Sequence, residues 1–258
     1  MKKIITFMVL VASVLSVLAQ DTFKRSQYVS ERGDTLRYRF LTPGRIAQDE
    51  TYPLVIFLHG AGERGNDNES QLVHGGQMWL NPVVREEFPA FIMAPQCPTS
   101  GYWAYSERPQ KGFAPDSMPD EEALTPVFRS LMELVDTFVK ENPVDTDRVY
   151  IMGLSMGGMA TFDLACRYPE RFAAAVPICG SVKPERLSRA AKVPFRIYHG
   201  DADNVVPVSA SRAAYRALRK AGAKPVYREF PGVTHGSWNP AFSDTELLPW
   251  LFAQTKKD

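Results

Sequence analysis

Residues 149–158 read Val-Tyr-Ile-Met-Gly-Leu-Ser-Met-Gly-Gly, an apolar run that leads straight into the pattern Gly-x-Ser-x-Gly. The apolar run from Arg148 to Met152 predicts a buried strand. A proline-free stretch follows it, and its apolar spacing predicts a helix that ends near Tyr168. A strand, a sharp turn and a helix in this order are what a serine nucleophile on a strand-to-helix turn requires.

The two glycines of the pattern have a steric role. A strand that turns abruptly into a helix crowds the backbone around Ser155, and Gly153 and Gly157 remove the side chains that would clash. The turn lifts the serine hydroxyl clear of the sheet and aims the helix N-terminus at it, so that the Met156 N–H can stabilise an oxyanion. The pentapeptide alone could arise by chance among 17 glycines, but its context favours a catalytic serine.

The composition is that of an ordinary globular chain. Its 258 residues are 45% hydrophobic and 23% charged, which suits a single α/β domain with a large core. The formal net charge is +1 and the basic residues are scattered, which argues against nucleic-acid binding. Cys97, Cys166 and Cys179 lack Cys-x-x-Cys pairing and neighbouring metal-ligand histidines, so we expect buried thiols, although export would permit one disulfide. No metal or organic cofactor is implied.

The N-terminal residues have the features of a secretory signal peptide. Lys2 and Lys3 precede an apolar run over residues 4–18, and the small residue Ala19 fits a cleavage site before Gln20. A membrane anchor is the alternative, but the run is short of the roughly 20 residues that span a bilayer. We therefore expect a signal peptide over residues 1–19, a single domain over 20–258, a periplasmic or secreted location and no stable membrane insertion after signal removal.

Two patterns predict a mixed sheet. Residues 28–30 and 36–41 read as an antiparallel pair joined around Gly33, which would form one edge. From Tyr52 onward, continuous apolar runs alternate with helical segments, so we expect an α/β fold with a mostly parallel sheet and helices on both faces. The predicted strands cover residues 53–58, 90–94, 148–152, 173–178, 194–198 and 226–230, and the predicted helices cover 123–140, 209–221 and 246–252.

Two long stretches, residues 63–87 and 95–122, lack periodicity and emerge at the carboxyl ends of strands. In open parallel sheets this edge is where ligands bind. Aromatic side chains in the second stretch predict a binding wall, although they could instead pack onto the sheet edge: Tyr102, Trp103, Tyr105 and Phe113.

A serine hydroxyl needs a base, and the base needs an orienting group. His235 follows the last predicted strand, where a loop can fold back over the nucleophile, so we predict that His235 is the base. The acid should lie at the preceding strand end, in His199-Gly200-Asp201-Ala202-Asp203. We favour Asp203 because it lies past the turn, whereas we expect Asp201 to hydrogen-bond turn backbone.

The oxyanion hole needs a second backbone N–H beside that of Met156. The segment His59-Gly60-Ala61-Gly62 follows a predicted strand and has small residues that let the backbone approach a substrate. Ala61 or Gly62 is therefore the predicted second donor, and we expect His59 to support this loop rather than to transfer protons. The alternative is an ordinary glycine-rich turn after a strand.

These motifs together resemble the secreted single-domain esterases of the α/β-hydrolase superfamily. The motifs are residues 59–65 (HGAGERG), 153–158 (GLSMGG), 199–203 (HGDAD) and 235–238 (HGSW). The group includes feruloyl and acetylxylan esterases, polyhydroxybutyrate-depolymerase-like proteins and predicted peptidases, and the likeness spans residues 28–252. It implies that Ser155 attacks an ester carbonyl, His235 relays the proton, Asp203 orients His235, and water releases an acyl-enzyme.

We therefore expect a secreted serine carboxylic-ester hydrolase acting on small esters or on acyl or feruloyl esters of plant polysaccharide. Trp79, Trp103 and Trp238 are candidate stacking residues for sugar or phenolic rings, and Glu63 is a further candidate contact. A serine peptidase of the prolyl-oligopeptidase-like type is the first alternative, and Glu63 or Arg64 could then hold the peptide. A non-catalytic glycan-binding protein on a hydrolase fold is the second, because a fold alone does not establish function.

Overall fold

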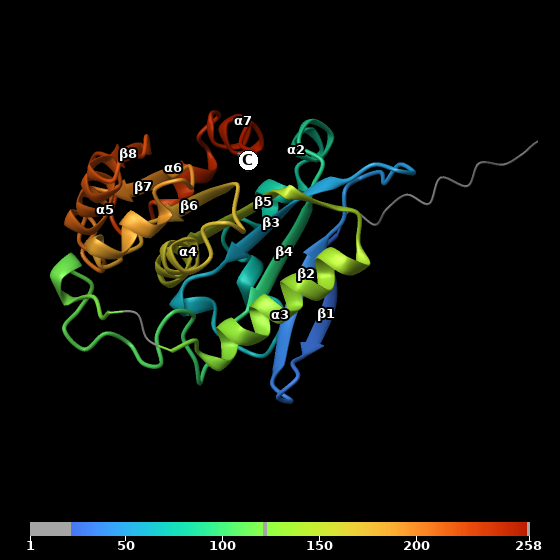
Figure 1. Cartoon of the computed structure of the whole chain (residues 1–258), viewed down its shortest axis with the longest axis horizontal. Helices are drawn as coiled ribbons and strands as arrows, with labels where there is room; N and C mark the ends of the chain where they lie inside the picture. Colours follow the sequence, from blue (N-terminus) through green and yellow to red (C-terminus); the bar gives the residue numbers. More distant parts are fainter. Residues whose placement is uncertain (1–21, 121–122, 257–258) are drawn as a thin grey trace, which may run out of the picture.

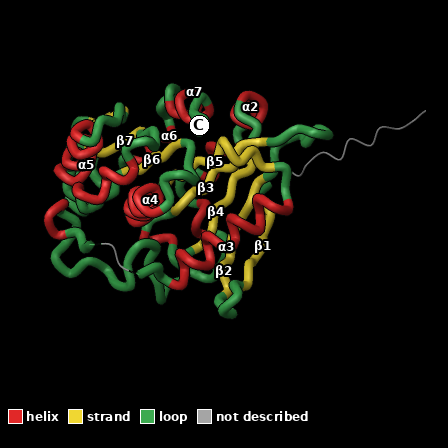
Figure 2. Tube along the Cα trace, in the orientation of Figure 1, coloured by secondary structure: helices red, strands yellow, loops and turns green. Residues whose placement is uncertain are grey.

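The computed structural model describes residues 22–120 and 123–256, and within them eight strands form one sheet in the order β1-β2-β4-β3-β5-β6-β7-β8. β2 pairs antiparallel with both β1 and β4, and the remaining pairs are parallel. Figure 2 shows these strands as one twisted layer. The strands are β1 (Lys24–Val29), β2 (Thr35–Leu41), β3 (Tyr52–Leu58), β4 (Phe91–Gln96), β5 (Val144–Leu154), β6 (Ala174–Ile178), β7 (Arg196–Gly200) and β8 (Val226–Phe230).

Helices cover both faces of this sheet. Alternate residues of β3 enter two separate cores: Leu54 and Ile56 pack with α3 and α4, whereas Val55 and Phe57 pack with α1 and α7. In Figure 1, α3 and α4 lie in front of the sheet. The helices are α1 (Gly76–Leu80), α2 (Pro82–Glu87), α3 (Pro126–Glu141), α4 (Met156–Arg167), α5 (Ser209–Lys220), α6 (Trp238–Phe242) and α7 (Leu247–Phe252). The predicted α/β fold with an antiparallel N-terminal edge is confirmed.

Several boundaries differ from the sequence prediction for local reasons. The helix expected from residue 123 begins at Pro126, because the Thr125 hydroxyl accepts a hydrogen bond from the Phe128 N–H and Pro126 occupies the first turn. The stretch 63–87, expected to be irregular, contains α1 and α2. These helices have only five and six residues, which is too short for a periodic signal.

Cys97, Cys166 and Cys179 are buried, as expected, and none of the three is in a disulfide. The predicted signal peptide over residues 1–19 lies outside the described residues. Within the described ranges, no helix combines the length and the apolar character needed to cross a membrane.

Candidate active site

Ser155 occupies the tight turn between β5 and α4. Its backbone has φ 52° and ψ −116°, a sparsely populated conformation for a residue with a side chain. A Cβ atom on Gly153 would overlap the Gly157 carbonyl, and one on Gly157 would overlap the Leu58 carbonyl. The two glycines are therefore required so that α4 can start directly against the strand ends, as the sequence predicted.

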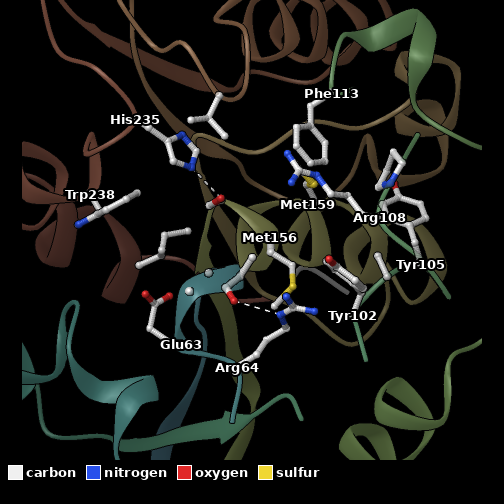
Figure 3. A pocket seen from close by; sticks show the side chains of 18 residues that line it. Glu63, Arg64, Tyr102, Tyr105, Arg108, Phe113, Met156, Met159, His235 and Trp238 are labelled. Atoms are coloured by element: carbon white, nitrogen blue, oxygen red, sulfur yellow. Dashed lines mark hydrogen bonds between the residues drawn. The ribbon is translucent and has the colours of Figure 1, made fainter. Parts of the chain in front are cut away.

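Three loops at the carboxyl ends of β5, β7 and β8 bring Ser155, Asp203 and His235 together. The Ser155 Oγ atom lies 2.8 Å from His235 Nε2, and His235 Nδ1 lies 2.8 Å from Asp203 Oδ2. The first contact is drawn in Figure 3. Because a carboxylate only accepts hydrogen bonds, Nδ1–H donates to Asp203, which leaves the Nε2 lone pair for the serine hydroxyl. This is the tautomer that can remove the serine proton.

Asp203 is the acid in this chain of contacts, and Asp201 serves the turn. Asp203 Oδ1 accepts hydrogen bonds from the N–H groups of Val205 and Val206, at 2.8 and 2.9 Å. Burial alone would raise the pKa of Asp203, but hydrogen bonds from His199, His235 and these two N–H groups hold it well below its usual range. Asp201 Oδ1 instead accepts from the Gly232 N–H at 2.6 Å, as expected for a turn-stabilising residue.

The loop after β3 approaches the nucleophile closely enough to supply oxyanion donors. A Cβ atom on Gly60 would lie 2.9 Å from the Leu154 Cδ1 atom and 3.5 Å from the Ser155 Cβ atom, so the loop backbone passes directly beside the serine. Ala61 and Gly62 follow in a 3-10 turn and line the same cavity as Met156. Met156 is the first residue of α4, whose initial N–H groups have no partner within the helix. The predicted donors therefore line the same cavity as Ser155.

His59 supports this loop, as the sequence suggested. Its Nδ1–H donates to the Gly60 carbonyl at 2.6 Å, and its Nε2 accepts the Cys97 N–H at 2.9 Å. Burial lowers the pKa of His59 to about 4, so that the imidazole is neutral. His59 therefore joins the loop of the predicted oxyanion donors to the end of β4, and both of its ring nitrogens are used in doing so.

A cavity of about 380 Å³ opens above Ser155. Figure 3 shows His235 and Trp238 on one side of it and Tyr102, Tyr105 and Phe113 on the other. The aromatic wall predicted for residues 95–122 is therefore present, with three of its four aromatic residues. Trp238 and Glu63 also line the cavity, as expected.

The expectation that Trp79 and Trp103 contact substrate is wrong. Trp103 is fully buried, its Nε1–H donates to the His59 carbonyl at 3.2 Å, and its ring packs 5.2 Å from the His59 ring. Trp79, on α1, is 2% exposed and belongs to the core on the α7 side of the sheet. Both rings are core residues because an indole contributes a large apolar surface, which sequence alone cannot distinguish from a binding surface.

Two arginines add charge to the cavity: the sequence named Arg64 only as a possible peptide contact and gave no role to Arg108. Arg64 is fixed by hydrogen bonds to the carbonyls of Ala61 and Gly101, at 3.0 and 3.1 Å, and stacks 4.2 Å from the Tyr102 ring. Arg108 lies 5.2 Å from the Phe113 ring in the same wall. Arginine beside aromatic rings in an irregular loop was a usable signal, because such pairs hold a guanidinium over a π face.

On the opposite side, Glu63 Oε1 lies 3.5 Å from His74 Nε2. The His74 ring packs 4.9 Å from Trp238, whose edge meets the His235 ring at 5.5 Å. The irregular loop that carries His74 is therefore linked through Trp238 to the predicted base. The spacing of this loop in the sequence gave no sign of the contact.

Among the residues that the structure describes, one group has donor atoms close enough to bind a metal. Donor atoms of Cys179, Asp203 and His235 lie within 4.8 Å of one another. Asp203 and His235 are hydrogen-bonded to each other, and burial raises the pKa of Cys179 to about 12, which keeps the thiol protonated. These donors fit a hydrogen-bonded aspartate–histidine pair better than a metal site.

Comparison with known families agrees with this geometry. The family model of the phospholipase/carboxylesterase hydrolases matches residues 46–246, which include the segments of all three candidate catalytic residues. The chain belongs to this family. The predicted membership of the α/β-hydrolase superfamily, in its esterase class, is thereby confirmed.

Two curated relatives illustrate the likeness. Carboxylesterase SOBER1 of Arabidopsis thaliana is 26% identical over 201 residues, covering 72% of this chain and 84% of the relative. The protein NocK of Nocardia uniformis subsp. tsuyamanensis is 29% identical over 211 residues, covering 80% of this chain. The match spans only 57% of the length of NocK.

Solved structures share the fold. A thermostable esterase superimposes with a TM-score of 0.83 at 33% identity, over 92% of this chain and 64% of that one. A CE1 ferulic acid esterase from Anaeromyces mucronatus superimposes with a TM-score of 0.65 at 14% identity, over 88% of this chain and 89% of that one. The second likeness is one of fold alone.

Proposed function

We propose that this family member is a serine carboxylesterase that hydrolyses esters of aromatic acids, such as feruloyl esters of plant polysaccharide, through an acyl-enzyme. The observation that carries the proposal is the continuous contact from Ser155 Oγ to His235 to Asp203 at the floor of a cavity with an aromatic wall. Ser155 attacks the ester carbonyl, His235 takes the hydroxyl proton, and the oxyanion is held by the N–H groups of Met156 and Ala61 or Gly62.

The direction of proton transfer assigns the two sides of the cavity. His235 returns its proton to the leaving alcohol oxygen, so the alcohol must lie next to His235 and Trp238. The acyl group then points to the opposite wall, where Tyr102 and Phe113 offer ring faces and Met159 offers a flexible apolar surface. An aromatic acid fits this wall better than acetate, which would leave most of it uncovered.

The ferulic acid esterase from Anaeromyces mucronatus has the same fold, which is compatible with this substrate class, but the proposal depends on the cavity of this chain. The complete set of Ser155, Asp203 and His235 argues against a non-catalytic glycan-binding role. A peptidase is the remaining alternative, since a peptide would use the same acyl-enzyme chemistry.

The test compares methyl ferulate, p-nitrophenyl acetate and an aminoacyl p-nitroanilide as substrates of the purified protein. We expect kcat/KM to be higher for the ester bond of methyl ferulate than for the amide bond of the anilide. We also expect a feruloyl adduct on Ser155, detected by mass spectrometry after rapid quenching. Ser155→Ala should lower kcat by about 10⁴-fold or more. Ser188→Ala, which changes an exposed serine outside the cavity, should leave it unchanged.

Two results would overturn the proposal. The first is equal turnover by wild type and Ser155→Ala, which would show that Ser155 is not the nucleophile. The second is faster cleavage of the anilide than of methyl ferulate, which would favour the peptidase.

The location of the protein is part of the same proposal. Lys2, Lys3 and the apolar run over residues 4–18 support export to the periplasm or medium, where plant polysaccharide is met. N-terminal sequencing of the protein from the periplasmic or culture fraction should start at Gln20. Recovery of the uncleaved chain in the membrane fraction would contradict export.

A further inference from the structure

A second histidine contacts the carboxylate of the proposed acid. His199, at the end of β7, is fully buried, and its Nε2 atom lies 3.2 Å from Asp203 Oδ2. This is the oxygen that accepts His235 Nδ1–H at 2.8 Å from the other side. Asp203 Oδ2 is therefore shared by two imidazoles, one facing the nucleophile and one facing the interior of the protein.

The contacts of His199 fix its tautomer. Nε2 lies 2.9 Å from the Val206 carbonyl as well as 3.2 Å from Asp203, and both partners only accept hydrogen bonds. Nε2 must therefore carry a proton. On the other side, Nδ1 lies 2.7 Å from the Ser211 hydroxyl of α5, which can rotate to donate to it. The contacts thus run from Ser155 through His235, Asp203 and His199 to Ser211.

We infer that His199 is a positioning residue for the proposed ester hydrolysis, donating through Nε2–H to Asp203 and so limiting how strongly that carboxylate holds the proton of His235. A carboxylate that satisfies two imidazole donors offers less negative charge to each of them. Less charge on the partner carboxylate makes it easier for the His235 imidazolium to give its Nε2 proton to the leaving alcohol. His199 also fixes the rotation of the carboxylate, since each of its oxygens faces two donors.

Other charged groups around His199 are already matched. Glu229 on β8 faces it, but Arg212 of α5 pairs with Glu229 at 2.5 and 2.8 Å and lowers its pKa to about 2. Cys179 at the end of β6 is a protonated thiol, because burial raises its pKa to about 12. Asp203 and His235 are therefore the groups through which a change at His199 reaches the reaction.

The test uses two polar variants of similar size. The amide nitrogen of Gln in His199→Gln occupies the place of Nε2 and still reaches Asp203, whereas that of Asn in His199→Asn occupies the place of Nδ1 and does not. We expect His199→Asn to raise the pKa of His235, measured by NMR titration of labelled histidine, by about one unit. The acid limb of the kcat/KM profile should shift to higher pH by the same amount, with about a tenfold loss near neutral pH.

His199→Gln should keep the wild-type His235 titration and pH profile. If the two variants shift the profile equally, or neither shifts it, the inference is wrong. A measurement that needs no variant is the ¹⁵N chemical shift of His199 in the wild type. A proton on Nδ1 and none on Nε2 would remove the bond to Asp203 and overturn the inference directly.

These readouts separate this inference from the proposed function on which it rests. The His235 titration and the His199 tautomer are measured in the resting protein. They remain decisive even if no ester proves to be a substrate.

Discussion

Asp203→Asn is the substitution for which the structure gives the sharpest expectation. Each carboxylate oxygen faces two N–H groups: those of Val205 and Val206 on one side, and those of His235 and His199 on the other. An amide has only one acceptor oxygen, so one pair of donors must face its NH₂ group in either orientation. If the NH₂ group faces His235, the imidazole must turn its lone pair to Nδ1 and present Nε2–H to the serine.

His235 then can no longer accept the serine proton. A tautomer change of this kind in a serine–histidine–acid site lowers kcat by about 10⁴-fold, which corresponds to about 5 kcal/mol of transition-state stabilisation. The matched control is Asp201→Asn, because Asp201 lies two residues away and bonds only the turn at Gly232. We expect that control to stay within about tenfold of wild type, since it loses one charge-assisted hydrogen bond.

The assay is the steady-state kcat for methyl ferulate of both variants, with the melting temperature as a check on folding. If folded Asp203→Asn keeps activity within tenfold of wild type, the assignment of the acid is refuted. A loss of several orders of magnitude in Asp201→Asn alone would transfer the role to Asp201.

Three further predictions follow from other contacts. Phe113→Ala should raise KM for methyl ferulate about fivefold by removing part of the aromatic wall, with little change in KM for p-nitrophenyl acetate. The control Phe88→Ala, whose ring packs on Phe252, should leave both values unchanged. Equal effects of the two variants would show that Phe113 does not contact the acyl group. Gly157→Ala should lower the melting temperature by about 8 °C, because its Cβ overlaps the Leu58 carbonyl, which costs about 3 kcal/mol of folding free energy. An unchanged melting temperature would contradict the tight turn between β5 and α4. Asp244 has a pKa lowered to about 2, where hydrogen bonds from Tyr198 and Arg196 outweigh burial, so its stabilisation is present above about pH 4 and is lost as the pH falls towards 2. Asp244→Asn should therefore show a smaller decrease of its urea midpoint between pH 5 and pH 3 than wild type does, and equal decreases would contradict this linkage.

Much of the site could be predicted because its residues follow from the order of the elements. Ser155 lies in a pattern whose glycines have a steric cause, and the carboxyl ends of neighbouring parallel strands must bring Asp203 and His235 to the same edge. The strands were found because runs buried on both faces are continuous in sequence. These features are local, or follow from topology, and so can be deduced from a single chain.

The remaining features depend on packing between distant segments. Trp79 and Trp103 have the residue type of binding aromatics, and only the fold shows that they are covered. The contact of His199 with Asp203 was not predicted, because a serine nucleophile needs only one base and the motif gives no reason for a second histidine. Its separation of four residues across a strand end was the available signal.

Trp103 has a consequence for how this enzyme class could change its substrates. Its indole is tied to the His59 carbonyl, and its own carbonyl accepts the Thr125 hydroxyl at 2.7 Å, so it anchors the segment that carries Tyr102 and Tyr105. The neighbours of the anchor can therefore vary while the indole still holds the loop after β3 through the His59 carbonyl. Divergence at positions 102 and 105 would alter which acids are accepted, whereas loss of the indole would impair every substrate alike. Positions 102 and 105 would therefore set the selectivity for the acid, whereas position 103 would support catalysis for every substrate.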